Sequence, residues 1–283
     1  MSGGPDSLAL LLLAQSALPA RIEAATVDHG LRPESASEAA MVAEICRSLG
    51  VPHQTLPIAV PKGNLQDRAR TARYAALGEW CAGRDLAALA TGHQCDDQAE
   101  TLVMRLNRGS GLAGLAGVRA RGTVPGRALP LVRPLLEWRR TELEAIVAAA
   151  GLAPVRDRSN DDGSFDRVRI RKALAGADWL DPAALSRSAA HLGEAEAYLK
   201  AKIDEAWRER VRGEGGAIRF MPGPSDFEAC EIARMIIESL GGAARRSEIP
   251  AMVARLRGGE NASLGGVLAQ VRKGEWRFGR EPP

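Results

Sequence analysis

Short apolar runs alternate with helical patterns over the first 150 residues, and this alternation limits the possible folds more than any other feature of the sequence. Strands separated by whole helices cannot form hairpins, so they pair in parallel with helices on both faces of the sheet. We therefore predict an α/β fold whose ligands bind at the carboxyl ends of the strands. The expected strands are 22–28, 53–58 and 86–91, and the expected helices are 6–15, 35–49, 65–81, 96–107 and 139–150.

The remainder of the chain indicates a second, smaller domain. We expect a catalytic domain over residues 1–180, a long amphipathic connecting helix over 181–212, and a small α-rich C-terminal domain over 213–283. In the last of these, helical patterns precede two short strand candidates around Leu268 and Phe278. Glycines and prolines between residues 213 and 224 separate it from the connecting helix.

Composition excludes several classes of protein. With 45% hydrophobic and 26% charged residues, the chain is typical of a soluble globular protein rather than a disordered or fibrous one. The longest apolar run, residues 8–14, is far too short to cross a bilayer, and the first seven residues lack the basic charge of a signal peptide. The four cysteines form no C-x-x-C pair, so we expect a cytoplasmic protein without a membrane partner.

Charge is unevenly distributed along the chain. Residues 119–172 hold twelve basic and seven acidic side chains, whereas the whole chain carries a formal charge of only +3. This excess is compatible with a polyanionic partner. Because 33 of the 38 basic residues are arginine, a compositional bias explains the excess equally well. Aromatic residues make up only 4% of the chain, so we do not expect a base-stacking surface.

The segment Ser2-Gly3-Gly4-Pro5-Asp6-Ser7 directly precedes an apolar helix. Two glycines let backbone amides approach an oxyanion, the hydroxyls add donors, and the helix N-terminus supplies positive potential. This combination suits a phosphate group, although no Walker A motif occurs. A simple turn, with Ser2 or Asp6 as helix cap, is the alternative.

Two further segments follow expected strands. Asp28 and His29 lie at the end of the first strand, where a base or ribose could bind, although turn residues also occur there. His93, Asp97 and Glu100 follow the third strand at helical spacing, so one face presents all three. Such a group suits either a metal site or an acid/base and amine-binding site. An acidic helix N-terminus explains the aspartates but not the histidine together with the glutamate.

Other motifs carry less information. Residues 109–114 match G-x-G-x-x-G, but a helix rather than a strand precedes them, so we reject a dinucleotide site and expect a flexible loop. Arginines gather over residues 68–74 and 156–172, where each group either binds phosphates or forms a solvated face.

In order and spacing these segments resemble the tRNA(Ile)-lysidine synthase family of the PP-loop (N-type) ATP pyrophosphatase superfamily. The matching stretches are SGGPDS at 2–7, VDHGLRPES at 27–35, RARTARY at 68–74, TGHQCDDQAETLVMRLNRGSGLAGLAG at 91–117, RPLLEWRRTEL at 133–143 and DRSNDDGSFDRVRIR at 157–171. The resemblance covers most of residues 1–190 and more loosely the tail. It implies a Rossmann-like sheet of the adenine nucleotide alpha hydrolase-like type.

The resemblance also implies a reaction. The family uses ATP to adenylate the C2 carbonyl oxygen of the wobble cytidine in tRNA(Ile) with a CAU anticodon, releasing pyrophosphate. Free L-lysine then attacks C2 and AMP leaves. ATP with Mg²⁺ is the implied cofactor pair, and the partners are this tRNA and L-lysine, with a homodimer as an open alternative.

Roles follow for the matching residues. The nucleotide site comprises Ser2, Gly3, Gly4, Pro5, Asp6, Ser7, Asp28 and His29, with Asp6 near Mg²⁺. The catalytic residues are Asp97, Glu100, Arg73 and His93. Asp97 and Glu100 also bind and deprotonate lysine, and Arg167, Arg169 and Arg171 hold lysine or tRNA. The tail domain is expected to hold the tRNA by its shape and phosphates.

The sequence differs from the family in one respect, and two alternative functions are also considered. Relatives have a strand directly before the phosphate loop, whereas Met1 precedes Ser2 here, so we expect either a misassigned start or a truncated chain. Another PP-loop tRNA-modifying enzyme, such as a thiolase, is one alternative, and the scattered cysteines disfavour it. A non-catalytic tRNA-binding relative is the other.

Overall fold

A computed structural model describes residues 1–30, 35–59, 65–155 and 166–281. The chain divides into two compact units, Met1–Glu194 and Ala195–Pro283. Each is described separately below. The expected segment Asp157–Asn160 lies outside the described residues.

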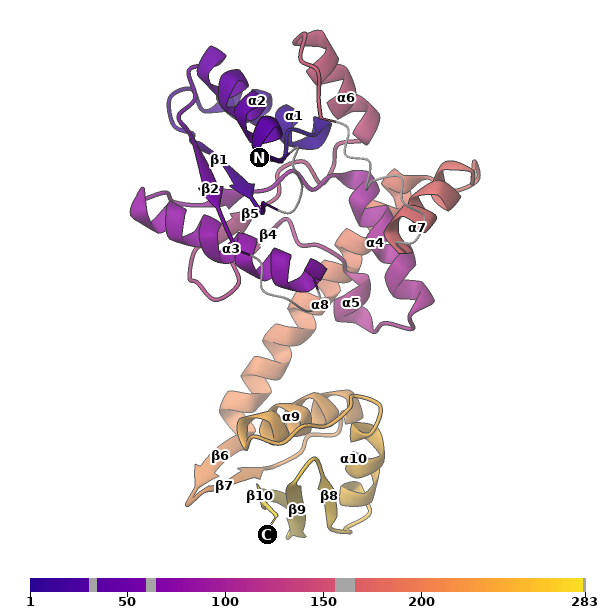
Figure 1. Ribbon diagram of the computed structural model, residues 1–283. Coiled ribbons are helices and arrows are strands. Elements are labelled where there is room, and N and C mark those ends of the chain that lie inside the picture. Colours follow the sequence, from indigo (N-terminus) through magenta and orange to yellow (C-terminus); the bar gives the residue numbers. More distant parts are fainter. Residues whose placement is uncertain (31–34, 60–64, 156–165, 282–283) are drawn as a thin grey trace. The chain divides into compact units, whose positions relative to one another are not determined.

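The first unit contains the predicted alternation of helices and strands (Figure 1). Its helices are α1 (Pro5–Ala17), α2 (Ser35–Ser48), α3 (Leu65–Gly83), α4 (Cys95–Asn107), α5 (Leu112–Leu115), α6 (Arg140–Ala149), α7 (Asp166–Ala175) and the start of α8 (Pro182–Arg210). Its strands are β1 (Ala24–Asp28), β2 (His53–Pro57), β3 (Leu89–Ala90), β4 (Arg121–Thr123) and β5 (Pro130–Val132).

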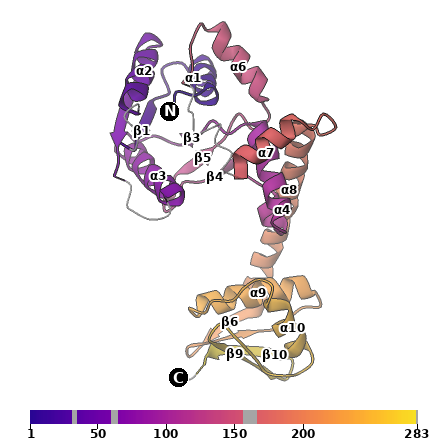
Figure 2. The same cartoon turned by 45° about the vertical axis from the view of Figure 1, so that its right-hand side comes forward.

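Strand β1 shows why helices cover both faces of the sheet. It pairs in parallel with β2, and its successive residues enter different cores. Ala24 packs with α1 and α2 through Leu11 and Val42, whereas Ala25 packs with α3 through Leu77. A strand buried on both sides must be apolar at consecutive positions, as β1 is. Figure 2 shows α1 and α2 on one side of β1 and α3 on the other, so the predicted α/β class is confirmed.

Strands β3 and β5 pair in parallel, and β4 adds to β5 in antiparallel. The structure therefore includes two strands that the sequence pattern did not indicate. β4 is fully exposed and has no apolar signal, and β5 is apolar but only three residues long, too short to indicate a strand by itself. Since α4 begins five residues after β3 ends, its first turn lies at the carboxyl end of this sheet.

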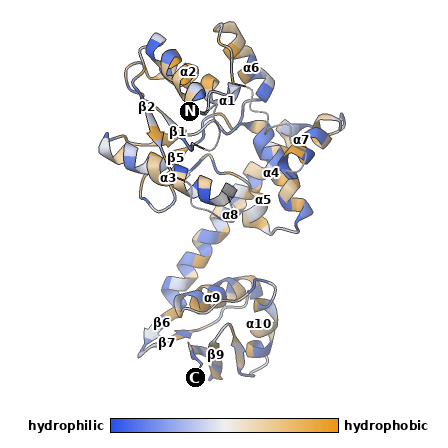
Figure 3. Ribbon diagram, in the orientation of Figure 1, coloured by the Kyte–Doolittle hydropathy of each residue, from blue (hydrophilic) through white to orange (hydrophobic). Residues whose placement is uncertain are grey.

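The second unit contains the expected helices and a larger sheet than expected. Helices α9 (Asp226–Ser239) and α10 (Ile249–Arg257) each have an apolar and a polar face (Figure 3). They pack against an antiparallel sheet of order β6-β7-β10-β9-β8, of which only β9 and β10 were expected. The strands are β6 (Val211–Glu214), β7 (Ala217–Phe220), β8 (Ala262–Leu264), β9 (Val267–Arg272) and β10 (Glu275–Arg280).

The core of this unit lies between the helices and one face of its sheet. Phe220, Trp276 and Phe278 are almost completely buried there, and the rings of Phe220 and Trp276 meet edge to face at 5.6 Å. Strands β6 and β7 were not predicted because each has only four residues, and β6 contains one apolar residue, Val211. None of the described helices in either unit combines the length and apolar character needed to cross a bilayer.

Candidate active site

The loop before α1 has the geometry of an anion site. Gly3 adopts φ +73°, and a Cβ there would lie 2.8 Å from the side chain of Val155, so glycine is required on both counts. Gly4 caps α1 in an extended conformation without a side-chain cap, and Pro5 begins the helix. Backbone amides at the start of α1 therefore stay available to a bound anion.

Two hydroxyls complete this loop. The Ser2 Oγ donates to Ser7 Oγ at 3.2 Å, and Ser7 Oγ donates to the carbonyl oxygen of Gly4 at 3.0 Å. Hydroxyls held beside free helix amides add donors for phosphate oxygens. Neither Ser2 nor Asp6 caps α1, because the N-cap is Gly4 and it has no side-chain cap hydrogen bond.

Gly92 brings the end of β3 against this loop. A Cβ on Gly92 would lie 2.9 Å from the carbonyl oxygen of Asp6 and 3.4 Å from the amide nitrogen of Ser7. Any larger residue would separate the two segments. The motif after β3 and the loop before α1 therefore form one site, and the key residue for their contact was not singled out from the sequence.

The carboxyl group of Asp6 occupies an unusual position within this site. Its Oδ1 is buried and has no hydrogen-bond partner among the described residues. Burial, followed by repulsion from Asp97, raises the pKa of Asp6 to about 6, while Arg140 opposes the rise. A buried carboxylate oxygen without a donor is suited to a cation that binds with the ligand. No cluster of three metal-ligating side chains occurs in the described ranges.

Asp97 lies in the first turn of α4, where its carboxylate both caps the helix and pairs with an arginine. Its Oδ2 accepts the backbone N–H of Gln94 at 3.1 Å as part of a capping box, and its Oδ1 accepts from Arg167 at 2.7 Å. The residue is buried, and burial raises its pKa despite the nearby Arg167 charge. A carboxylate with a raised pKa can serve as a base near neutral pH.

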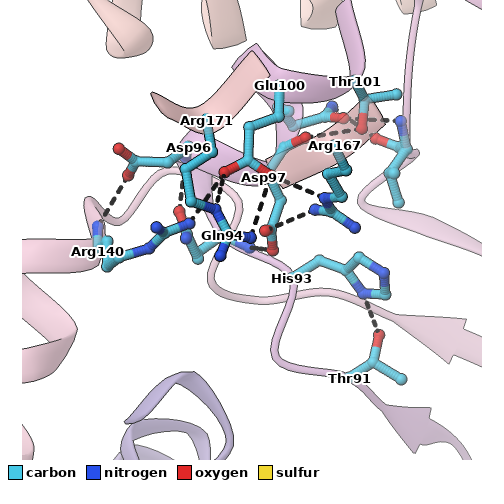
Figure 4. A network of polar contacts seen from close by, with 12 residues as sticks. Thr91, His93, Gln94, Asp96, Asp97, Glu100, Thr101, Arg140, Arg167 and Arg171 are labelled. Carbon is cyan, nitrogen blue, oxygen red and sulfur yellow. Dashed lines mark hydrogen bonds and ion pairs between the residues drawn. The ribbon is translucent and has the colours of Figure 1, made fainter. Parts of the chain in front are cut away.

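Glu100, one turn later, is held by three arginines (Figure 4). Its Oε1 accepts from Arg140 at 3.1 Å and from Arg171 at 2.8 Å, and its Oε2 accepts from Arg167 at 2.7 Å and from Arg171 at 3.5 Å. The side chain is only 2% exposed. Burial opposes its ionisation, but hydrogen bonds from Arg171 and Arg167 outweigh it and lower its pKa.

The arginines of α7 lie on two different faces of the helix because of its periodicity. Arg167 and Arg171, four residues apart, both reach the carboxylates of α4, whereas Arg169 pairs with Asp166 at 2.5 Å on another face. Arg169 is thus not brought to the site with the other two. Arg140 at the start of α6 joins instead, and its backbone N–H also donates to Asp96 at 2.9 Å.

His93 lies beside these groups as a neutral base. Its Nδ1 is 2.9 Å from the hydroxyl of Thr91. Burial, then the charges of Arg133 and Arg167, lower its pKa to about 4, so the ring carries no charge at neutral pH. Arg73 on α3 also acts on His93 electrostatically. Burial lowers the pKa of the Arg73 guanidinium, which stacks over the ring of Tyr74 at 5.5 Å.

Asp28 is the last residue of β1, and His29 directly follows it. Asp28 accepts the backbone N–H of Gly30 at 2.9 Å, which lowers its pKa and makes it a turn residue. His29 has a buried Nδ1 without a partner among the described residues. Burial and then the charge of Arg73 lower its pKa, so Arg73 acts on both histidines.

These side chains form two adjoining regions. The first is an anion-binding loop with an unpartnered carboxylate, and the second is a buried carboxylate pair surrounded by arginines. A phosphorylated substrate fits the first region, because helix amides and arginines favour negative charge. A basic nucleophile fits the second, because Asp97 can take up a proton.

Comparisons with known proteins agree with this geometry. The family model described as "PP-loop domain" matches residues 1–177. A tRNA(Ile)-lysidine synthase of Novosphingobium aromaticivorans is 48% identical and aligns with 100% of this chain and 88% of its own length. One of Zymomonas mobilis is 40% identical, with 100% and 88% covered, and one of Ruegeria pomeroyi is 39% identical, with 99% and 70% covered.

One solved structure is similar at the level of the fold. The U34-tRNA thiolase NcsA from Methanococcus maripaludis, described with its [4Fe-4S] cluster, matches with a TM-score of 0.56. The match covers 68% of this chain and 67% of that chain at 16% sequence identity. At that identity it supports the arrangement of helices and strands and nothing about the chemistry.

Proposed function

This chain belongs to the tRNA(Ile)-lysidine synthase family of PP-loop proteins, and from that membership we infer that it is an ATP-dependent ligase that forms lysidine on tRNA(Ile). We propose in addition that free L-lysine is joined to C2 of the wobble cytidine of the CAU anticodon. The observation that supports this most strongly is the buried pair Asp97 and Glu100 beside the phosphate loop. The cytoplasmic location and the homodimer remain predictions.

We propose that the loop from Ser2 to Ser7 holds the phosphates of ATP. The amides at the start of α1 and the two serine hydroxyls are the donors. Mg²⁺ fits here because Asp6 offers a buried oxygen without a partner among the residues described. Bound there, the ion would neutralise phosphate charge, and Asp6 would hold it.

The first step forms one bond and breaks one. The C2 carbonyl oxygen of the cytidine attacks the α-phosphorus of ATP, and pyrophosphate leaves with the electrons of the broken P–O bond. We propose that Arg73 and neutral His93 stabilise the negative charge that develops on the phosphate oxygens. Because His93 is uncharged at neutral pH, it acts as a hydrogen-bond donor rather than as a cation.

In the second step lysine replaces AMP. A lysine ammonium has a free pKa of about 10.4, so it must lose a proton before its nitrogen attacks C2. We assign this proton to Asp97, whose pKa is raised and whose Oδ1 has one donor only. The four hydrogen bonds to Glu100 occupy its oxygens, so we propose that Glu100 positions Arg140, Arg167 and Arg171 instead.

The thiolase alternative has weaker support. Cys46, Cys81 and Cys230 pack in three separate hydrophobic clusters, and Cys95 is buried at the start of α4. Burial raises the pKa of each of these thiols, which keeps them protonated. Sulfur transfer by a cysteine thiolate would need the opposite shift.

The function can be tested with the full chain, ATP and Mg²⁺. Pyrophosphate release is measured with a tRNA(Ile) transcript bearing CAU, with one bearing UAU, and without RNA. We expect release only with CAU, followed by incorporation of labelled lysine into that transcript. Retained tRNA binding without release would instead identify a non-catalytic relative.

A further inference from the structure

The sheet of the second unit has one face that none of the described helices of that unit covers. Alternation along its strands places Trp276, Phe278 and Phe220 against α9 and α10 and turns the residues between them outward. The outward residues are Arg212 and Glu214 on β6, Ala217 and Arg219 on β7, Glu275, Arg277 and Gly279 on β10, Leu268, Gln270 and Arg272 on β9, and Ser263 on β8.

Three arginines stand in register across this face. Arg212 is paired with Arg219, and Arg219 with Arg277, so the row crosses β6, β7 and β10. Gln270 on β9 continues it beside Arg277. Like charges directly opposite one another destabilise a sheet, so this row costs stability in the free protein. Two inter-strand spacings make it about 10 Å long, enough to contact more than one phosphate.

The acidic residues on this face neutralise it only in part. Arg219 pairs with Glu214 at 3.1 Å and with Glu275 at 3.6 Å. Arg272 and Arg277 form no ion pair with any described residue. Four arginines and two glutamates therefore leave a positive face. The polar side of α9, on the opposite face of the unit, carries Asp226, Glu228, Glu231 and Glu238 around Arg234.

We propose that this arginine face binds the phosphate backbone of an RNA stem. The inference rests on the proposed function, which makes a tRNA the substrate, and it specifies the face of the tail domain that holds it. A polyanion would neutralise Arg212, Arg219, Arg272 and Arg277 together and thus offset the repulsion within the row. The contact is independent of base sequence, because it reads charge and not base edges.

The composition of the face favours a stem over a single-stranded loop. No aromatic residue is among its outward side chains, so unstacked bases would find nothing to stack on. Double-stranded RNA is recognised mostly by shape and by its phosphates and riboses. Arginines spaced at strand intervals suit that mode of binding.

The test removes the two unpaired arginines from the full-length protein. The double variant Arg272→Gln, Arg277→Gln is compared with wild type for binding to a blunt 12-base-pair RNA duplex and to the CAU transcript over a range of salt. We expect Kd to rise about tenfold at 0.1 M salt and the slope of log K against log salt to fall by about 0.7–0.9 for each lost contact.

A matched control removes the same charge elsewhere in the unit. Arg246→Gln with Arg255→Gln removes cations that pair with Glu231 and Glu260, and it should leave Kd and the salt slope unchanged. An unchanged Kd in the first variant, equal losses in both variants, or binding to anionic phospholipid vesicles but not to the duplex would each overturn the proposal. Duplex binding needs no ATP, so a protein that lacks CAU-dependent pyrophosphate release still tests it.

Discussion

A Cβ atom at Gly92 would lie 2.9 Å from the carbonyl oxygen of Asp6, so the end of β3 touches the phosphate loop only because residue 92 is glycine. Gly92→Ala must push these backbones apart by several tenths of an ångström. A misplacement of about 1 Å can cost about 10²-fold in rate, so we expect kcat/KM for ATP to fall by about tenfold. Gly83→Ala, with no atom within 4 Å of the new methyl group, should leave kcat/KM unchanged.

Asp97→Asn should separate the two chemical steps. The amide keeps the size of the side chain and can still accept the N–H of Gln94, but it cannot take a proton from lysine. General-base catalysis typically contributes about 10²–10⁴-fold, and we expect lysine transfer in a single turnover to slow by that factor. Pyrophosphate release should be far less affected. Near-normal transfer by this variant would remove Asp97 from its proposed role.

Two substitutions on one helix test the arginine geometry. Arg171→Gln removes two hydrogen bonds to buried Glu100, whereas Arg169→Gln removes only a surface pair with Asp166. We expect the first to raise KM for lysine about tenfold or more and the second to change it less than twofold, because exposed ion pairs contribute little. The resemblance to the family assigned both residues to holding lysine or tRNA. Equal effects would show that α7 is arranged differently in the working enzyme.

The sequence predicted those parts of the site that depend on local periodicity. Asp97 and Glu100 share a face of α4 because helical spacing places them there, whereas His93 precedes the helix, whose N-cap is Gln94, so its expected place on that face was wrong. The glycines at 3 and 4 are adjacent to the helix whose amides they expose. The apolar run of β1 identified that strand, since a strand buried on both sides must be apolar at consecutive positions.

Residues that act through tertiary contacts could not be found in this way. Arg140 reaches Glu100 from a helix 40 positions away, and nothing in its own segment distinguishes it from Arg139. Gly92 matters only because α1 packs beside it. β6 and β7 were missed for a similar reason. Their inward apolar residues pack against α9 and α10, and a local sequence pattern does not show these contacts.

Asp6→Asn should make the protein more stable and less active. The pKa of Asp6 is about 6 in the folded state and 3.8 for an ordinary aspartate, so the folded state binds the proton more tightly. Stability therefore falls as the pH rises from about 4 to about 6. Above pH 6 the difference between the two pKa values corresponds to a cost of about 3 kcal/mol, which solvent screening of this partly exposed side chain reduces to about 2 kcal/mol. At pH 7.5 the variant should gain about that much, and at pH 4 the gain should vanish. Urea unfolding at both pH values measures it.

Asp166→Asn is the control, because the pKa of Asp166 is shifted in the opposite direction to that of Asp6. Hydrogen bonding from Arg108, followed by the charge of Arg169, lowers the pKa of Asp166, so its ionised form stabilises the fold above its unfolded pKa. This variant should show no gain at pH 7.5 and should retain pyrophosphate release. A stability gain in Asp6→Asn that is the same at both pH values would mean that packing, not ionisation, is responsible. A gain confined to the higher pH, together with lost release, would show that Asp6 is kept for ATP at the expense of stability.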